Sequence, residues 1–152
     1  MGLDTTHDAW HGAYSAFMRW RQEIAKVAGL PPLMLMEGFY KSNDPIFDPM
    51  WSMDKGSRSE NPDPTLAALK QQLPIRWDCL KPSPLHILLY HSDCEGDIPW
   101  EDCQPIASAL SELLPKIEGE GGGHIGNYKQ KTQQFIDGLL RAAAAKEDLI
   151  FQ

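Results

Sequence analysis

The sequence has few cysteines, fewer bases than acids and no long apolar run, and each shortage argues against a class of protein. Its 3 cysteines are an odd number without the spacing of a secreted disulfide scaffold, so we expect free thiols in a reducing cytoplasm. With 14 Lys and Arg against 21 Asp and Glu, the formal charge of −7 argues against binding to nucleic acid or to an anionic membrane. No apolar stretch approaches the roughly 20 residues of a membrane-spanning helix.

The chain also lacks the short motifs of several enzyme classes. It has no Walker loop, no dinucleotide-binding glycine pattern and no nucleophile elbow, and the glycines at 119–123 follow a predicted helix rather than a strand. What it has is the composition of a folding domain, with 42% hydrophobic and 23% charged residues over 152 positions. Without an internal repeat or a domain break, it predicts one α+β domain with about four helices packed on a small sheet.

The spacing of apolar residues and the positions of glycine and proline predict the secondary-structure elements. A helix is predicted over residues 5–28, because apolar side chains recur there at helical spacing and Gly29, followed by two prolines, ends it. A long Pro/Ser/Asp-rich loop spans 41–64 and a Gly-rich linker spans 118–126. The other predicted elements are helices over 65–72, 101–114 and 127–146, a strand over 85–91 and an edge strand over 148–152, while the run 33–39 is undetermined.

The first candidate site lies at the start of the predicted helix 5–28. At about 100° per residue, His7, His11, Asp4 and Asp8 share one arc, and imidazole and carboxylate are ligands that zinc and similar ions accept. The segment between the histidines lacks the glutamate of the zinc proteases. The competing interpretation is an ordinary helix start with acids in its first turn. We include Tyr14 among the candidate ligand-binding residues.

The second candidate site follows the predicted strand 85–91. His91, Asp93 and Cys94 lie in an acidic, Gly-containing turn, which is where α/β proteins commonly place sites. The turn is not a calcium loop, because Ile98 stands where that loop needs glycine and Gln104 where it needs glutamate. The pair of His91 and Cys94 lacks an identifiable oxyanion donor. The competing interpretation is a solvated turn before the next helix.

Four stretches carry a resemblance to a known group of proteins: residues 2–17 (GLDTTHDAWHGAYSAF), 91–96 (HSDCEG), 135–140 (FIDGLL) and 147–151 (EDLIF). They resemble small uncharacterised proteins of phage and prophage genomes. The resemblance covers both ends of the chain and omits the middle loop. It implies an intracellular, phage-associated role and supplies no activity, cofactor or catalytic residue.

The leading hypothesis is therefore a small, acidic, non-enzymatic binding protein that sequesters a small polar ligand or engages a host protein. Its binding residues would be His7, His11, Tyr14, His91, Asp93 and Cys94. A rival is a metal-dependent hydrolase in which a divalent metal is the cofactor and His7, His11 and Asp93 are its ligands. A third is a structural or assembly protein acting through the loop 41–64. Any shared site requires the first cluster to lie beside the second in the fold.

Overall fold

A computed structural model describes residues 2–39, 74–92, 94–118 and 127–152. The chain divides into two units, one of residues 1–30 with 82–152 and the other of residues 31–81. The predicted loop 41–64, the predicted helix 65–72, Asp93 and all but the first residue of the linker 118–126 lie outside the described residues.

Four α helices and two small antiparallel sheets occur in the described part of the chain, so the predicted α+β class is confirmed. The helices are α1 (Tyr14–Val27), α4 (Leu85–Tyr90), α5 (Trp100–Leu113) and α6 (Tyr128–Ala145). The strands are β1 (Gly2–Asp4), β2 (His11–Ala13), β3 (Gly96–Ile98) and β4 (Leu149–Phe151). Short 3-10 turns are η1 (Thr6–Asp8), η2 (Leu33–Leu35), η4 (Trp77–Cys79) and η5 (Leu114–Lys116).

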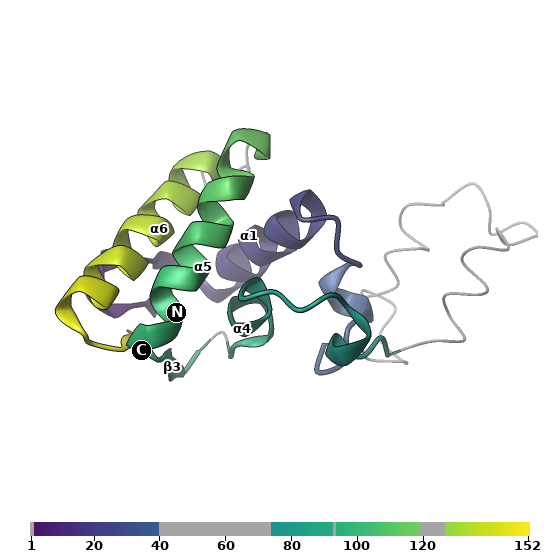
Figure 1. Ribbon diagram of the computed structural model, residues 1–152, viewed down its shortest axis with the longest axis horizontal. Coiled ribbons are helices and arrows are strands. Elements are labelled where there is room, and N and C mark those ends of the chain that lie inside the picture. The colour runs from purple at the N-terminus through teal and green to yellow at the C-terminus, as the bar shows by residue number, and fades with distance from the viewer. Residues whose placement is uncertain (1, 40–73, 93, 119–126) are drawn as a thin grey trace, which may run out of the picture. The chain divides into compact units, whose positions relative to one another are not determined.

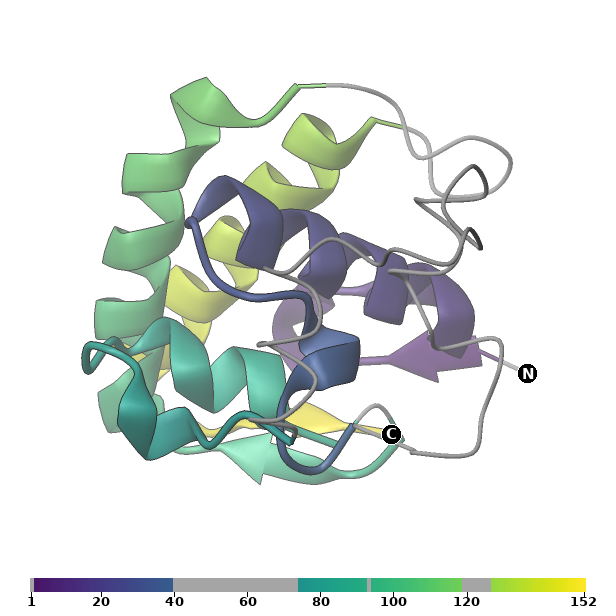
Figure 2. The same ribbon diagram turned by 90° about the vertical axis from the view of Figure 1, so that its right-hand side faces the viewer.

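Helices α5 and α6 run antiparallel side by side, and α1 lies next to them (Figures 1 and 2). The apolar residues Phe17, Trp20 and Ile24 of α1 are buried. The core of this unit is aromatic. Phe17 of α1 is fully buried, and its ring contacts the rings of Trp10, Trp20, Phe135 and Phe151 at centroid distances of 5.1–6.3 Å. These partners come from four parts of the chain, so the single ring holds the hairpin, α1, α6 and β4 together.

The predicted helix over residues 5–28 is wrong in its first half, where β1, η1 and β2 form a hairpin and the helix begins only at Tyr14. Asp4 pairs with His11 across the two strands. Thr5, Thr6 and Gly12 are poor helix formers, which weakens the helical alternative. The hairpin instead gains backbone hydrogen bonds to the other end of the chain, because the Asp4 amide donates to the Gln152 carbonyl at 3.0 Å.

The predicted strand over 85–91 is also wrong, since these residues form the short helix α4. Leu85, Leu88 and Leu89 are buried at helical spacing, which the nearly continuous apolar run concealed. The helix follows a Pro-Ser-Pro segment, and the Ser83 hydroxyl accepts a hydrogen bond from the Leu85 amide at 3.2 Å. At the other end, the buried Arg21 guanidinium donates to the carbonyls of Leu88, Leu89 and His91.

The remaining predicted elements in the described part are confirmed to within a residue or two. Gly29 has a φ of +76° and ends α1, as its position predicted. Asn127 caps α6 by accepting from the amides of Lys129 and Gln130. Pro105 is the sixth residue of α5, so the carbonyl of Glu101, an exposed residue, has no amide donor four residues on.

The two antiparallel sheets are linked to each other by an isolated bridge and by backbone hydrogen bonds. Within the sheets, β1 pairs with β2 and β3 pairs with β4. Between them, Thr5 bridges to Phe151 and the Gln152 amide donates to the Asp4 carbonyl at 2.9 Å. The predicted edge strand 148–152 is β4, which pairs with β3 in a two-stranded sheet.

In the second unit, the two described flanks of residues 40–73 are paired with each other. Met36 bridges to Ile75 in parallel, and the Glu37 carboxylate accepts from the Trp77 amide at 2.9 Å. Over all the described ranges, no helix combines the length and apolarity needed to span a membrane.

Candidate functional site

The first candidate cluster forms in the hairpin rather than on a helix. His11 lies between two carboxylates: its Nδ1 is 2.7 Å from Asp4 Oδ1 and its Nε2 is 3.2 Å from Asp8 Oδ1. The His11 side chain is exposed. The hydrogen bonds to Asp4 and then to Asp8 raise the pKa of His11 above its ordinary value of 6.5. The structure thus brings together three of the four predicted residues, His11, Asp4 and Asp8, through the hairpin, whereas His7 faces Glu147.

The loop between β1 and β2 has an unusual backbone. His7 and Asp8 have φ values of +59° and +54°, a left-handed conformation that costs residues other than glycine about 1–3 kcal/mol each. The surrounding structure must therefore hold the loop in place. Helix α6 does so, because Arg141 donates from Nε and Nη2 to the His7 carbonyl at 3.1 and 2.6 Å. Gln134 donates to the Asp8 carbonyl at 3.1 Å.

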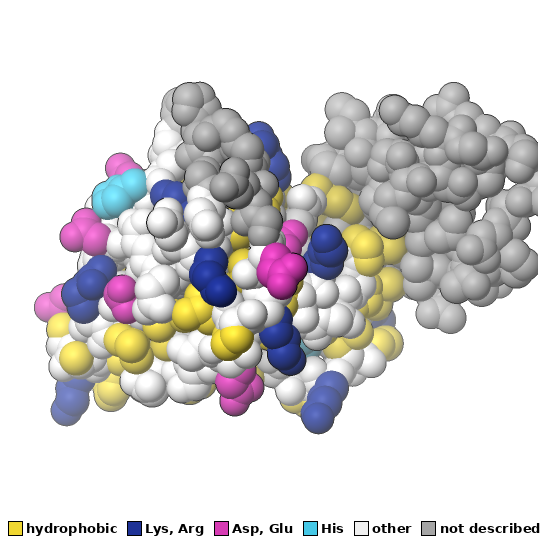
Figure 3. Space-filling model, turned by 90° about the horizontal axis from the view of Figure 1, so that it is seen from above, with side chains coloured by type: hydrophobic (Ala, Val, Ile, Leu, Met, Phe, Trp, Pro, Cys, Tyr) yellow, Lys and Arg dark blue, Asp and Glu magenta, His cyan; other side chains and the backbone are white. Residues whose placement is uncertain are grey.

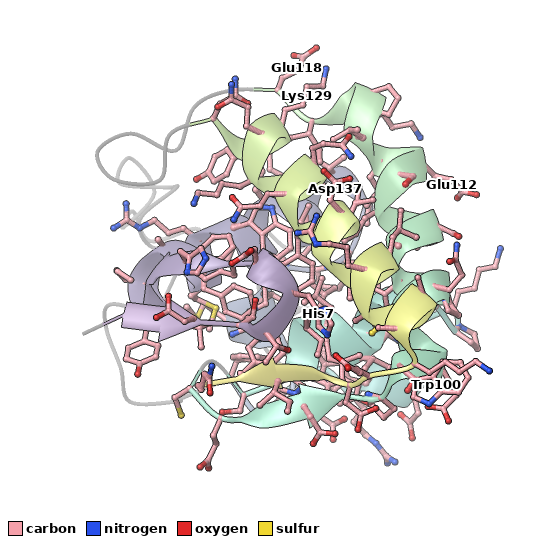
Figure 4. The ribbon with its side chains drawn as sticks, turned by 90° about the vertical axis from the view of Figure 1, so that its left-hand side faces the viewer. His7, Trp100, Glu112, Glu118, Lys129 and Asp137 are labelled. Carbon is pink, nitrogen blue, oxygen red and sulfur yellow. The ribbon has the colours of Figure 1, made fainter. Side chains whose placement is uncertain are left out.

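Gly138 allows this loop to approach α6. A Cβ at this position would lie 2.4 Å from the Cβ and 2.5 Å from the Cα of Ala9, the residue that follows Asp8. Ala9 is fully buried. Only a glycine in the middle of the helix lets the loop backbone lie this close (Figure 4, where His7 lies beside α6).

Gly138→Ala should lower the free energy of unfolding by about 1–3 kcal/mol, because the added methyl group meets backbone atoms that cannot rotate away. Helix propensity alone would give the opposite sign, a gain of up to about 1 kcal/mol. Denaturant unfolding of this variant beside Lys129→Ala, an exposed change on the same helix, measures the difference. A more stable Gly138→Ala protein would contradict the close approach.

An open groove of about 420 Å³ lies along α6 beside this loop. We call it the α6 groove, and its lining residues are Asp8, Gln130, Gln133, Gln134, Asp137 and Arg141. Several of its donors are used within the protein: Arg141 and Gln134 bond the loop carbonyls, and Gln133 Nε2 donates to Asp137 Oδ1 at 2.9 Å. The groove thus combines two carboxylates with one guanidinium, which is anchored on the loop.

The geometry does not favour a metal ion at this cluster. The two nitrogens of His11 point to different carboxylates on opposite sides of the ring, so Asp4 and Asp8 do not converge on one position. His7 Nε2 lies 3.1 Å from Glu147 Oε2 instead. Among the residues that the structure describes, no group of three or more His, Cys, Asp or Glu side chains could hold an ion.

In the second candidate cluster, His91 packs against another aromatic ring. The His91 ring stacks on Phe151 with centroids 4.3 Å apart, and its Nδ1 and Nε2 lie 2.8 and 3.1 Å from the carbonyl oxygens of Ser92 and Asp97. Cys94 is exposed, with Sγ 3.4 Å from the Ser92 hydroxyl. Asp93 lies outside the described residues.

His11 and His91 have different surroundings. Asp4 and His11 are directly paired across β1 and β2, and both are exposed. Phe151 pairs with Thr5, the residue after β1, and both are buried. His91 stacks on this buried Phe151, whereas His11 lies on the exposed side with Asp4. Asp93, the other member of the shared site that the sequence suggested, lies outside the described residues.

Tyr14, the cysteines and His86 occupy different positions in the fold. Tyr14 is the first residue of α1 and is half-buried. All three cysteines are free thiols, and burial raises the pKa of Cys103 to about 11, which makes this thiol a poor nucleophile at neutral pH. Burial also lowers the pKa of His86, which lies in α4.

Sequence reasoning missed the α6 half of the site. Gln134, Gly138 and Arg141 share a face of that helix but follow the loop by more than 120 residues, and a polar helix face predicts only exposure to solvent. Gly138 was the available signal, because a glycine inside a helix costs about 1 kcal/mol and indicates a packing reason.

Comparison of the chain with protein-family models, with curated proteins and with solved structures finds no match. On the face drawn in Figure 3, basic and acidic side chains of the described residues are interspersed and do not form a patch of one sign. The candidate site therefore rests on the geometry of the hairpin loop and α6.

Proposed function

We propose that this protein is a non-enzymatic binding protein that engages a positively charged, hydrogen-bond-donating group of a ligand or host protein in the α6 groove. The observation that carries the proposal is the pair of carboxylates, Asp8 and Asp137, on a groove whose one guanidinium, that of Arg141, is bound to the His7 carbonyl. The hydrogen bonds of the two carboxylates to His11 and Gln133 engage Oδ1 of each, so Oδ2 of each can accept from a ligand. Guanidinium and ammonium groups complement such acceptors.

Two further observations support this proposal. The formal charge of −7 attracts a cationic partner at long range and speeds its association. The strained loop beside the groove is held by several independent contacts, and strain of this kind concentrates at functional sites. The resemblance to phage and prophage proteins supports an intracellular, phage-associated setting for this role.

The test is an NMR titration of ¹⁵N-labelled protein with a blocked five-residue peptide of alternating glycine and arginine. We expect the side-chain amide resonances of Gln130, Gln133 and Gln134 to shift. The matching glycine and glutamate peptide should leave them unchanged. Asp137→Asn should weaken binding of the arginine peptide about two- to five-fold, the effect of losing one exposed ion pair worth about 0.5–1 kcal/mol.

The control variant is Glu112→Gln, which removes the same charge from an exposed position on α5, away from Asp137 (Figure 4). Its affinity for the arginine peptide should stay close to that of the wild type. Equal weakening by both variants would mean that net charge, and not the α6 groove, attracts the peptide. Unchanged groove resonances would overturn the proposal.

No observation on the described residues supports either alternative function, the metal-dependent hydrolase or the structural or assembly protein. The hydrolase requires ligands that converge on an ion, whereas His7 and His11 face separate carboxylates. The structural or assembly role was assigned to the loop 41–64, which lies outside the described residues.

A further inference from the structure

The position of His11 between Asp4 and Asp8 favours its protonated form. Both ring nitrogens lie within hydrogen-bond distance of a carboxylate oxygen, at 2.7 and 3.2 Å. A carboxylate accepts and does not donate, and a neutral imidazole has only one N–H. Both contacts are therefore hydrogen bonds only when His11 is an imidazolium ion.

We propose that the proton on His11 regulates the α6 groove, holding Asp8 in the hairpin when present and releasing the Asp8 carboxylate to the groove when lost. The proposal rests on the proposed function for its consequence, since Asp8 lines the groove that would bind the ligand. The proton-controlled contact itself exists without any ligand.

The contact with Asp8 is the one that breaks first. Asp4 and His11 are held opposite each other by the strand pairing, and their side-chain contact is the shorter of the two. Asp8 lies in the loop with a φ of +54°, and its contact is the longer. Neutral His11 keeps its one N–H for Asp4 and turns the lone pair of Nε2 toward Asp8, so that attraction becomes repulsion.

The charged groups around His11 come from three elements. Asp4 of β1 and Asp8 of η1 face its ring, and Lys131 of α6 donates to its backbone carbonyl at 3.2 Å. The two acids raise the pKa of His11 above 6.5. A raised pKa means that the stabilisation of the hairpin is complete below pH 6.5 and is lost as the pH rises through the folded-state pKa.

An NMR titration of the ligand-free protein between pH 5 and pH 9 tests the contact. We expect the His11 ring resonances to give a midpoint above 6.5. The Asp8 backbone amide and the side-chain amide of Gln134, which donates to the Asp8 carbonyl, should shift with the same midpoint. A His11 midpoint at or below 6.5, or Asp8 resonances that do not follow it, would overturn the proposal.

Substituting asparagine for either of two carboxylates of the α6 groove gives a matched pair of variants. Asp8→Asn removes a carboxylate that contacts His11, so the His11 midpoint should fall toward 6.5. Asp137→Asn removes the same charge from the other side of the groove, where Asp137 bonds Gln133, and should leave the midpoint almost unchanged. Equal shifts in both variants would show a general effect of charge and would refute a specific contact.

The affinity of the arginine peptide at different pH values distinguishes a failure of this proposal from a failure of the proposed function. Its affinity should be higher above the His11 midpoint than below it, and Asp8→Asn should remove that difference. If Asp8 follows the His11 midpoint but the peptide does not bind at any pH, the contact stands and the proposed function fails. If the peptide binds in the groove with the same affinity on both sides of the midpoint, the regulation fails and the proposed function stands.

Discussion

Arg21→Met should lower the free energy of unfolding by about 2–4 kcal/mol, although methionine fills much of the same space. The arginine side chain is 1% exposed, and Nη1 lies 2.5–3.4 Å from three carbonyl oxygens at the end of α4. Its guanidinium also lies 4.6 Å from the centre of the Phe17 ring. Methionine offers no donor, so these buried acceptors and the negative end of the helix dipole lose their partner.

Urea unfolding of Arg21→Met beside Arg19→Met measures this loss. Arg19 is exposed on the other side of α1, so the same chemical change there should stay within about 0.5 kcal/mol. Hydrogen exchange of the Leu88 and Leu89 amides should accelerate in Arg21→Met because α4 loses its capping donor. Equal losses in the two variants would contradict the assigned role of Arg21.

Phe17→Ala should cost about 3–5 kcal/mol, the largest effect that we expect from a single truncation. The Phe17 side chain is fully buried, and the four aromatic rings around it come from the hairpin, α1, α6 and β4. No one of these elements can move into the space without pulling away from another, so the cavity stays largely open.

The matched control is Leu140→Ala, an apolar truncation at a side chain on α6 that is 38% exposed. It should cost at most about half as much, because less apolar surface returns to water. Thermal and denaturant unfolding give both values. A loss in Phe17→Ala no larger than that in Leu140→Ala would show that the aromatic core does not organise this unit.

The chemistry of the first candidate cluster could be predicted from the sequence, but its assembly could not. Asp4, Asp8 and His11 were singled out with His7 because the four would share one arc of a helix, which does not form there. Asp4, Asp8 and His11 do meet, through a cross-strand pair and a turn. The groove could not be predicted, because Arg141 and Gln134 reach the loop from a helix more than 120 residues away.

The sequence by itself determined the elements whose ends carry local chemistry. Gly29 ends α1 because it adopts a left-handed φ without steric cost, and Asn127 begins α6 because its side chain accepts from two backbone amides. Apolar residues at helical spacing were sufficient for α5 and α6. All these signals act between residues a few positions apart, so they need no information about the rest of the fold.

Only the tertiary structure decided the segments whose partners are distant in sequence. Residues 2–13 form a hairpin because β4, from the other end of the chain, satisfies the backbone of Asp4. Residues 85–90 form a helix whose last carbonyls bond Arg21, a residue of α1. Local patterns favoured the opposite assignment in both places. In both places the structure depends on hydrogen bonds between residues distant in the sequence, which no local periodicity records.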